Sequence, residues 1–338
     1  MKILLYTELE KKIGKSGLGK AIKHQMKALD SQGIEWTQDK DCTDYDVLHV
    51  NWYGLGSRKM AKKAHKKGKK VVYHAHSTEE DFRNSFMFSN LVAPLFKKWL
   101  ISSYNLGDVL ITPTPYSKRL LEGYGINKKI YAISNGIELD KFKKKPELRK
   151  TFRERYGYTE EDKVIIGVGL YIERKGIVDF VELAKRLPDY KFIWFGYSPL
   201  KAATKPVRQA VNTKLPNLVF AGYVEQMLIA EAMNGCDLYL FPTLEETEGI
   251  PIIEACACET PALIRDIPVF DEWLVDGKNV YKAKDVNEFE EKIKKIVNKE
   301  LPDVTKEGYK VALERDIKSV GEQLKGVYEY VLNMKDEK

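Results

Sequence analysis

The sequence predicts an α/β protein made of two doubly wound domains, each a parallel sheet covered by helices. Short apolar runs alternate with longer amphipathic stretches along the chain, a pattern typical of buried parallel strands joined by helices. The 338 residues are enough for two hydrophobic cores. The alternation breaks between residues 130 and 145, where Asn135-Gly136 precedes a polar run, and this break predicts a linker.

The apolar runs place the expected elements in order. In the first domain we expect strands over residues 2–7, 46–50, 70–75 and 108–112, and helices over 17–32, 57–68, 87–104 and 115–124. In the second we expect strands near 163–168, 190–195, 218–221, 237–241 and 261–264, with a helical tail from 285. We therefore predict domains over residues 1–145 and 146–316 that face each other across a cleft, and a helix over 317–338 that packs back on the first domain.

Composition and charge narrow the class of protein. No apolar run is long enough to span a membrane, and the chain enters a strand at its start, so we expect a cytoplasmic protein. Residues 1–150 carry 29 basic and 16 acidic side chains, whereas residues 151–338 carry 27 and 33. The basic first half, densest at residues 58–70, indicates contact with an anionic surface, although a solvated helix would carry the same run.

An acidic turn between a strand and a helix is the strongest functional signal. The apolar run ending at Phe241 leads into a turn that contains Glu246 and Gly249, and a second apolar run from Ile250 carries Glu254. In a parallel sheet, ligands bind at the carboxyl ends of strands, where helix N-termini offer N–H groups to anions. We interpret the two carboxylates as acceptors for sugar-nucleotide hydroxyls; the alternative is that they only favour the helix dipole or are solvated.

Two cations stand at the start of a predicted helix in the second domain. Arg174 and Lys175 follow the run Gly167-Val168-Gly169, at a helix end where positive charge is unfavourable. A diphosphate bound there would be held by Lys175, together with Arg174 and the helix N–H groups.

A glycine-rich turn opens the first helix of the chain. Residues 14–20 nearly match a nucleotide-binding P-loop, but Ala21 replaces the hydroxyl residue that would hold magnesium, so we do not expect a nucleotide hydrolase. The amides of Gly17 and Gly19 remain candidates to approach a donor phosphate or sugar. Asp44 and Asp46 match a metal-binding pattern of some sugar transferases, but polar residues commonly precede a strand, and we expect neither a metal nor another cofactor.

Histidines follow the third predicted strand. His74 and His76 lie at its carboxyl end, where ligands bind, and we expect them to face opposite sides, so that one lines the cleft while the other packs.

Together these segments resemble the retaining glycosyltransferases of family 4, which have the GT-B fold of two Rossmann-like domains. Glu246 and Glu254 are similar to the family's E-x7-E signature, residues 133–142 to its segment before the linker, Lys175-Gly176 to its phosphate-binding pair, and His76 to its cleft histidine. The sequence departs from the family at Leu170, where an arginine is usual, and at Glu248, where an aromatic residue is usual.

The resemblance implies an enzyme that uses a nucleotide-sugar donor and retains the anomeric configuration. Glu246 would contact the transferred sugar, Glu254 the ribose and Lys175 the diphosphate, with His76 in the catalytic set. The residues implied at the donor are Gly17, Gly19, Arg174, Lys175, Glu246, Gly249, Ile250 and Glu254. Segments 15–25, 74–85 and 245–250 further resemble bacterial enzymes that add a second hexose to monoglucosyl-diacylglycerol for the lipoteichoic acid anchor.

A lipid acceptor would require the enzyme at the inner face of the cell membrane. Residues 85–100 are aromatic and apolar, and with the basic run they make the two-part signature of peripheral membrane binding, although a core helix under a loop would also fit. The residues predicted for the acceptor and membrane are Arg58, Lys59, Lys62, Lys63, Lys66, Lys67, Phe86, Phe88, Leu91, Phe96 and Trp99.

The expected partners are therefore a UDP-glucose or UDP-galactose donor, a glycolipid acceptor and an anionic membrane, without nucleic acid. Three other functions fit the same residues. A family 4 transferase could act on a capsule, polysaccharide or teichoic acid precursor; a nucleotide-sugar epimerase would need no acceptor; and a non-enzymatic protein would only bind the UDP-sugar.

Overall fold

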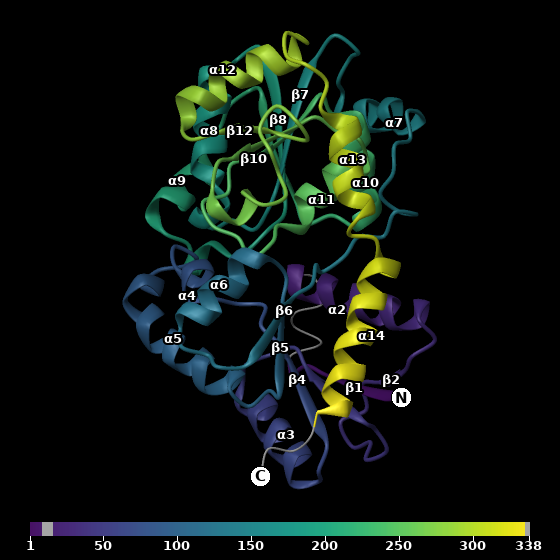
Figure 1. The fold of residues 1–338 in the computed structure, drawn as a ribbon. Helices are drawn as coiled ribbons and strands as arrows, with labels where there is room; N and C mark the ends of the chain where they lie inside the picture. Colours follow the sequence, from purple (N-terminus) through teal and green to yellow (C-terminus); the bar gives the residue numbers. More distant parts are fainter. Residues whose placement is uncertain (9–15, 335–338) are drawn as a thin grey trace. The chain divides into compact units, whose positions relative to one another are not determined.

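The computed structural model describes residues 1–8 and 16–334, and the chain divides into two compact units (Figure 1). The first unit contains residues 1–80, 92–136 and the chain from Arg315, and the second contains Asp81–Leu91 and Ile137–Glu314. Each unit has a six-stranded parallel sheet. The predicted α/β class is confirmed.

The first sheet has the strand order β2-β1-β3-β4-β5-β6. Its strands are β1 Lys2–Tyr6, β2 Glu35–Thr37, β3 Val47–Val50, β4 Lys70–His74, β5 Val109–Thr112 and β6 Lys129–Ala132. The central strands β3 and β5 consist of buried residues throughout, as expected for strands covered on both faces.

Helices cover both faces of the first sheet. Its helices are α2 Gly17–Ser31, α3 Leu55–Lys66, α4 Glu79–Phe82, α5 Ser89–Tyr104, which begins in the second unit, α6 Pro115–Gly123 and α14 Ile317–Asn333. One core joins Val47 and Val72 to α2 and α14, which lie side by side in Figure 1. The other joins Leu48 and Tyr73 to α3, α5 and α6.

The second sheet has the order β12-β11-β10-β7-β8-β9. Its strands are β7 Lys163–Val168, β8 Tyr190–Phe195, β9 Leu218–Gly222, β10 Leu238–Phe241, β11 Ala262–Arg265 and β12 Tyr281–Ala283. Its helices are α7 Glu147–Tyr156, α8 Ile177–Arg186, α9 Lys205–Asn212, α10 Gln226–Gly235, α11 Ile250–Ala257, α12 Val286–Val297 and α13 Thr305–Leu313, with short 3-10 turns at η1 Glu173–Lys175, η2 Leu200–Ala202 and η3 Pro268–Phe270. Helices α8, α9 and α12 share one core on this sheet (Figure 1).

The sequence prediction missed three strands, β2, β6 and β12, each at the edge of a sheet. They have only three or four residues and include polar side chains, so they carry no clear apolar run. In the described residues, no helix is both long and apolar enough to cross a bilayer.

The second unit takes up more of the chain than its predicted start at residue 146. Phe142 is buried, and the amide of Lys145 donates to Asn234 Oδ1 at 2.6 Å, so this stretch packs as part of the unit rather than as a free linker. The segment 81–91 also belongs to the second unit, where the amide of Met87 donates to the carbonyl of Ala202.

Candidate active site

The acidic turn lies at the carboxyl end of β10, as the sequence predicts. Gly249 caps α11 with φ +89°, a left-handed conformation that glycine adopts without strain. Ile250 follows as the first residue of α11 and is buried. Glu246 on the turn is buried, and Glu254 on α11 is completely so. Two carboxylates in such positions need polar partners to offset the loss of water.

Glu246 is held by groups from two neighbouring strand ends. Lys175 Nζ lies 2.5 Å from Glu246 Oε1, and Arg174 Nη1 lies 3.7 Å from Glu246 Oε2. The hydroxyl of Thr243 donates to Glu246 Oε1 at 2.9 Å. Arg174 also donates to the carbonyl of Glu245 at 2.8 Å. The structure thus brings together three of the predicted donor residues, which come from the ends of β7 and β10.

The charges of this cluster determine its ionisation. Burial raises the pKa of Glu246, but the positive charges of Lys175 and Arg174 outweigh that effect and hold the pKa below its ordinary value of 4.5. Burial lowers the pKa of Lys175, and the carboxylate of Glu246 opposes this shift. At 2.5 Å the pair is held as two ions, so the cluster presents buried positive charge beside a carboxylate.

A close backbone contact between Gly176 and Pro242 brings Lys175 next to Glu246. Gly176 has φ +74°, and a Cβ there would lie 2.1 Å from the carbonyl oxygen of Pro242, so only glycine allows η1 and the turn after β10 to meet. Arg265 reinforces the contact, because its Nε donates to the same carbonyl at 3.1 Å and its guanidinium pairs with Asp179 on α8. Arg174 is fixed in turn by the carbonyl of Asn84, which accepts its amide at 3.1 Å.

The two predicted glycines of the first helix lie in the other unit. Gly17 begins α2, and the hydroxyl of Ser16 caps the helix by accepting the amide of Gly19 at 3.2 Å. Gly17 is exposed, and a side chain there would meet no neighbouring atom, so space alone does not require a glycine. Gly14 and Lys15 lie outside the described residues.

His76 is part of a polar cluster in the first unit. Its ring stacks on that of His74 with 4.0 Å between centroids and 8° between planes, and His76 Nε2 lies 2.9 Å from Asn51 Oδ1. The expectation that the two histidines face opposite sides is therefore wrong. Side chains two residues apart along an extended chain point to the same face. Burial lowers the pKa of His76 from 6.5 to about 3.

The aspartate pair that could have held a metal is used structurally. Asp46 Oδ2 accepts the amide of Lys2 at 2.8 Å, and Asp44 lies 3.8 Å from Lys2 Nζ. Both residues precede β3 and so lie at the amino edge of the sheet, opposite the edge where ligands bind. Within the described parts of the chain, no cluster of three or more His, Cys, Asp or Glu residues has an arrangement suited to a metal ion.

Most of the residues predicted for the acceptor and membrane are exposed. This set comprises Lys59, Lys62, Lys63 and Lys66 of α3, Lys67 directly after α3, Phe86, Phe88, Leu91 and Trp99. Arg58 ties α3 to α5, because its guanidinium donates to Ser102 and Ser103 at 2.9 Å and lies over the Trp99 ring at 4.7 Å. Phe96 differs from the others, since its ring packs edge-to-face on Tyr53 against the core.

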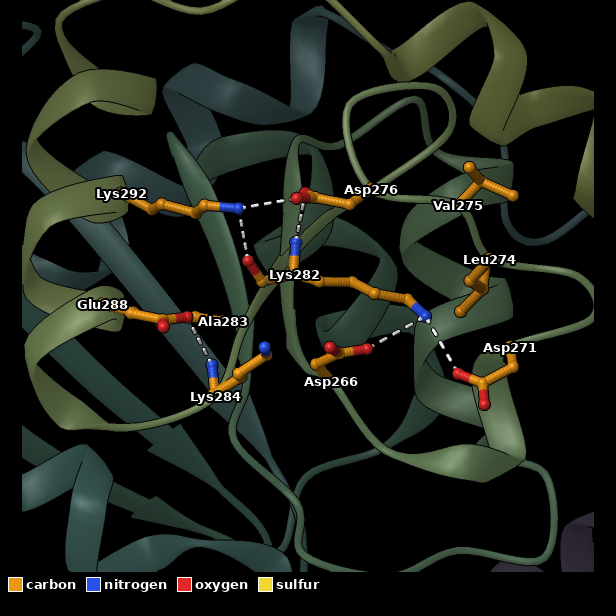
Figure 2. A pocket seen from close by; sticks show the side chains of 10 residues that line it. All are labelled: Asp266, Asp271, Leu274, Val275, Asp276, Lys282, Ala283, Lys284, Glu288 and Lys292. Atoms are coloured by element: carbon orange, nitrogen blue, oxygen red, sulfur yellow. Dashed lines mark hydrogen bonds and ion pairs between the residues drawn. The ribbon is translucent and has the colours of Figure 1, made fainter.

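A separate pocket of about 560 Å³ lies beside β11 and β12 (Figure 2). Two of its lysines are already paired within it: Lys282 lies 3.3 Å from Asp266 and 3.4 Å from Asp271, and Lys292 lies 2.8 Å from Asp276. None of the predicted donor residues lines this pocket. We place the candidate site at the cluster around Glu246, because there a buried carboxylate and two cations meet at the carboxyl ends of strands.

Several polar residues at these sites escaped the sequence prediction. Thr243 precedes Glu246 by only three residues, so the sequence could have indicated that its hydroxyl lies close to this carboxylate. Gln25 of α2 contacts both His49 of β3 and Asn51, which follows β3, and no motif marks these three residues.

Two family models match the chain. The model of the group 1 glycosyl transferases covers residues 149–311, and the model of glycosyltransferase family 4 covers residues 22–141. The processive diacylglycerol α-glucosyltransferase of Acholeplasma laidlawii is 41% identical over 336 residues, which are 99% of this chain and 100% of that protein. The α-galactosylglucosyldiacylglycerol synthase of Streptococcus pneumoniae is 26% identical and matches 75% of this chain and 66% of its own length.

Solved structures share the fold. Anabaena HepE in complex with UDP-glucose superposes with a TM-score of 0.79 at 17% identity, covering 98% of this chain and 100% of that one. Sucrose-phosphate synthase from Thermosynechococcus elongatus gives a TM-score of 0.80 at 14% identity, covering 98% of each chain. At such low identities these matches bear on the fold, which is GT-B. The two family models and the full-length relative show that this chain belongs to the family 4 glycosyltransferases and is a hexosyltransferase.

Proposed function

We propose that the enzyme transfers glucose or galactose from a UDP-sugar to a membrane glycolipid, monoglucosyl-diacylglycerol, and so makes a diglycosyl-diacylglycerol. The observation that carries this proposal is the 41% identity to the A. laidlawii diacylglycerol α-glucosyltransferase over the full length of both chains. The similar S. pneumoniae protein is likewise named as a synthase of a diglycosyl lipid, and HepE, which has the same fold, was solved with UDP-glucose.

The cluster in the second unit has the chemistry that a donor needs. Lys175 carries three N–H donors, so it can keep its contact with Glu246 and still donate to a phosphate oxygen. In our proposal Lys175 and Arg174 stabilise the diphosphate as it leaves, Glu246 contacts the transferred sugar, and Glu254 contacts the ribose. Gly249 and Ile250 place the first N–H groups of α11 at the same turn.

We propose that the acceptor hydroxyl attacks from the face that the diphosphate leaves, so that the anomeric configuration is retained. In this mechanism, the bond from the anomeric carbon to the diphosphate oxygen breaks as the bond to the acceptor oxygen forms, and the acceptor proton passes to the leaving phosphate. We assign no covalent nucleophile. The rate enhancement then comes from positioning and from stabilising the negative charge that develops on the diphosphate.

We further propose that the enzyme binds the inner face of the cell membrane through α5 and α3. Leu91 is 78% exposed and Leu95 is 66% exposed, and they lie one turn apart on α5, so they share a face of that helix. The exposed lysines of α3 accompany them, since Arg58 joins the two helices within the first unit. Exposed leucines beside lysines suit insertion at an anionic lipid surface.

The experiment uses the purified full-length protein and vesicles of phosphatidylglycerol that contain either diacylglycerol or monoglucosyl-diacylglycerol. Each is incubated with UDP-glucose or with UDP-galactose, and the glycolipids are identified by mass spectrometry and NMR. We expect a diglycosyl lipid whose new bond keeps the α configuration of the donor. A UDP-sugar that changes without an acceptor would indicate an epimerase, and a donor that binds but is never consumed would contradict the proposal.

A further inference from the structure

A continuous set of buried polar groups leads from His76 across the first unit to its last helix. Asn51 Nδ2 donates to Gln25 Oε1 at 2.8 Å, and Gln25 Nε2 lies 2.8 Å from His49 Nε2. His49 Nδ1 lies 2.6 Å from the hydroxyl of Tyr328 on α14. With the contact between His76 and Asn51, these bonds join α2, β3, the end of β4 and α14.

The register of the sheet explains why these residues meet. His49 and His74 follow Val47 and Val72 by two residues along β3 and β4, so they continue the apolar face that α2 and α14 cover. Gln25 and Tyr328 reach that face from the two helices. The cluster is thus the polar end of an otherwise apolar core, at the carboxyl edge of the sheet where ligands bind.

The donors and acceptors assign one tautomer to each ring. Asn51 presents its oxygen to His76, so His76 carries its proton on Nε2 and donates it. Gln25 Nε2 lies 2.8 Å from His49 Nε2 and 3.0 Å from His49 Nδ1. The hydroxyl of Tyr328 is the closer partner of Nδ1, at 2.6 Å, so we assign Nε2 as the acceptor for Gln25 and place the His49 proton on Nδ1, toward Tyr328. His74 Nδ1, at 3.2 Å from His49 Nε2, is a second donor to that atom. With these assignments all three imidazoles are neutral.

The assignment leaves Nδ1 of His76 as a hydrogen-bond acceptor. Within the described residues, no hydrogen bond reaches this atom, and the His76 side chain is mostly buried but keeps some exposed surface. The stack on His74 fixes the plane of the ring, and the bond to Asn51 fixes its rotation. The ring therefore presents a lone pair in a defined direction, which suits the hydroxyl of a sugar and not an anion.

We propose that Asn51, supported by Gln25, His49 and Tyr328, is a positioning residue that holds His76 as the Nε2–H tautomer, so that His76 Nδ1 accepts a hydrogen bond from a substrate hydroxyl. This inference rests on the proposed transferase function. It assigns the positioning of His76 to a polar network that includes side chains from α2 and α14, the two helices that cover one face of the first sheet.

The charged surroundings of His76 are consistent with a neutral ring. Among the described residues, His74 stacks on the His76 ring and His49 interacts with it electrostatically. Tyr328 of α14 contacts His49, and burial raises the pKa of Tyr328. The carboxylates that follow it in the chain are engaged elsewhere: Glu79 lies 3.4 Å from Lys97, and Glu80 accepts the hydroxyl of Tyr124. A carboxylate introduced at position 51 would be a new and direct partner for the ring.

The first test is the pH dependence of kcat for Asn51→Asp, measured by transfer to glycolipid vesicles. A carboxylate against Nε2–H favours the charged imidazolium, which cannot accept a hydrogen bond at Nδ1. We expect kcat of Asn51→Asp to fall by at least about fivefold from pH 8 to pH 6 relative to the wild type, with KM for the UDP-sugar within about twofold. Tyr73→Phe is the control. It removes a hydroxyl on β4 that donates to the carbonyl of Trp52 and is not part of the network, so this variant should follow the wild-type profile.

The second test needs no variant at position 51 and no turnover. Long-range proton–nitrogen NMR of the 15N-histidine-labelled protein at pH 7 reports the tautomer of each ring, and the loss of one signal in His76→Gln assigns His76. We expect Nε2–H for His76 and Nδ1–H for His49 and His74. A His76 ring protonated on Nδ1, or a folded and active Asn51→Asp enzyme with the wild-type pH profile, would overturn the inference. A wild type that transfers no sugar would instead contradict the proposed function.

Discussion

At the residue scale, the cluster around Glu246 puts three charged side chains where water is largely excluded. The side chains of Lys175 and Glu246 are 16% and 6% exposed. Taking two such ions out of water costs several kcal/mol each, which only close pairing and further hydrogen bonds offset. Charged groups buried at such a cost cluster at functional sites, and here the two cations would bind the negative charge of an incoming diphosphate.

Replacing Lys175 tests this use. We expect Lys175→Ala to lower kcat about ten- to a hundredfold, since a charge-assisted contact to the leaving diphosphate contributes about 1.5–3 kcal/mol. It should also reduce the free energy of unfolding by about 3 kcal/mol, because Glu246 keeps only Arg174 as a cationic neighbour. Steady-state kinetics and urea unfolding measure the two effects. Lys185→Ala on the exposed face of α8 is the control, and a stable Lys175→Ala enzyme with wild-type turnover would place the diphosphate elsewhere.

The two glutamates should separate binding from transfer. We expect Glu246→Ala to reduce kcat strongly while the Kd for UDP changes little, because UDP lacks the sugar that this carboxylate contacts in our proposal. Glu254→Ala should weaken UDP binding instead, through loss of the ribose contact. Calorimetric titration gives the Kd for UDP, and the transfer assay gives kcat. Measuring both for each variant shows which glutamate acts in binding and which in transfer. The opposite pattern would exchange the two assignments.

At the scale of elements, the ends of β3 and β4 make the stability of the first unit depend on pH. Burial lowers the pKa of His49 and of His76 from 6.5 to about 3, so between these values the unfolded chain binds protons that the folded unit does not. The free energy of unfolding should therefore fall as the pH decreases below about 6.5, by about 1.4 kcal/mol per pH unit for each such histidine.

Urea unfolding between pH 7 and pH 5 tests this dependence, because most carboxylates stay ionised across that range. The midpoint should fall steadily with acidification. His49→Gln removes one of the titrating rings and should flatten the slope. A midpoint that is constant over the range would show that the rings are already protonated in the folded protein or that they are solvated.

The face formed by α3 and α5 allows the apolar and electrostatic parts of membrane binding to be measured apart. Leu91→Ser with Leu95→Ser should weaken binding to both neutral and anionic vesicles by at least about tenfold, because each leucine loses an apolar contact of about 1.5–3 kcal/mol. Lys62→Ala with Lys66→Ala should weaken binding to anionic vesicles only, by about 1 kcal/mol per lysine, and this effect should vanish at high salt.

Exposed residues elsewhere serve as matched controls in the same sedimentation assay. Leu313→Ser on α13 and Lys325→Ala on α14 remove the same chemistry from other helices and should leave binding unchanged. If the α5 variants bind vesicles as the wild type does, the membrane face lies elsewhere on the molecule.

At the scale of the whole molecule, the proposed chemistry requires the donor, the acceptor and a lipid surface, and no metal ion. We therefore expect the transfer rate to stay within about twofold after treatment with EDTA and gel filtration. The physical reason is that Lys175 and Arg174 can supply the positive charge at the diphosphate that a metal would otherwise supply. A rate that is lost with EDTA and restored by magnesium would redirect attention to Asp44 and Asp46.

The charge of the whole molecule is distributed unevenly along the chain. Residues 1–150 have a net charge of +13 and residues 151–338 a net charge of −6. An excess of positive charge in the half that contains α3 and α5 would draw that half toward anionic lipid over about a Debye length, or roughly 10 Å at 0.1 M salt.

Much of the fold and part of the site could be predicted because their signals are local in the sequence. The buried strands β3, β5 and β10 are mostly apolar over four residues each, whereas the short edge strands β2, β6 and β12 each contain a charged side chain that interrupts the apolar pattern. Lys175 stood out as a cation at a helix start, and Glu246 as part of an acidic turn after a strand. The contact between them depends on how β7 and β10 lie side by side, which no local pattern specifies.

The amino-acid pattern by itself determined the doubly wound class, because burial and helix ends impose local periodicities, and the resemblance of its motifs indicated the family. Only the tertiary structure decided that segment 81–91 packs with the second unit, and that His76 is joined through Asn51, Gln25 and His49 to Tyr328. These contacts link residues up to 279 positions apart in the chain. Such pairings follow from the packing of strands and helices in space, and the order of residues along the chain leaves them open.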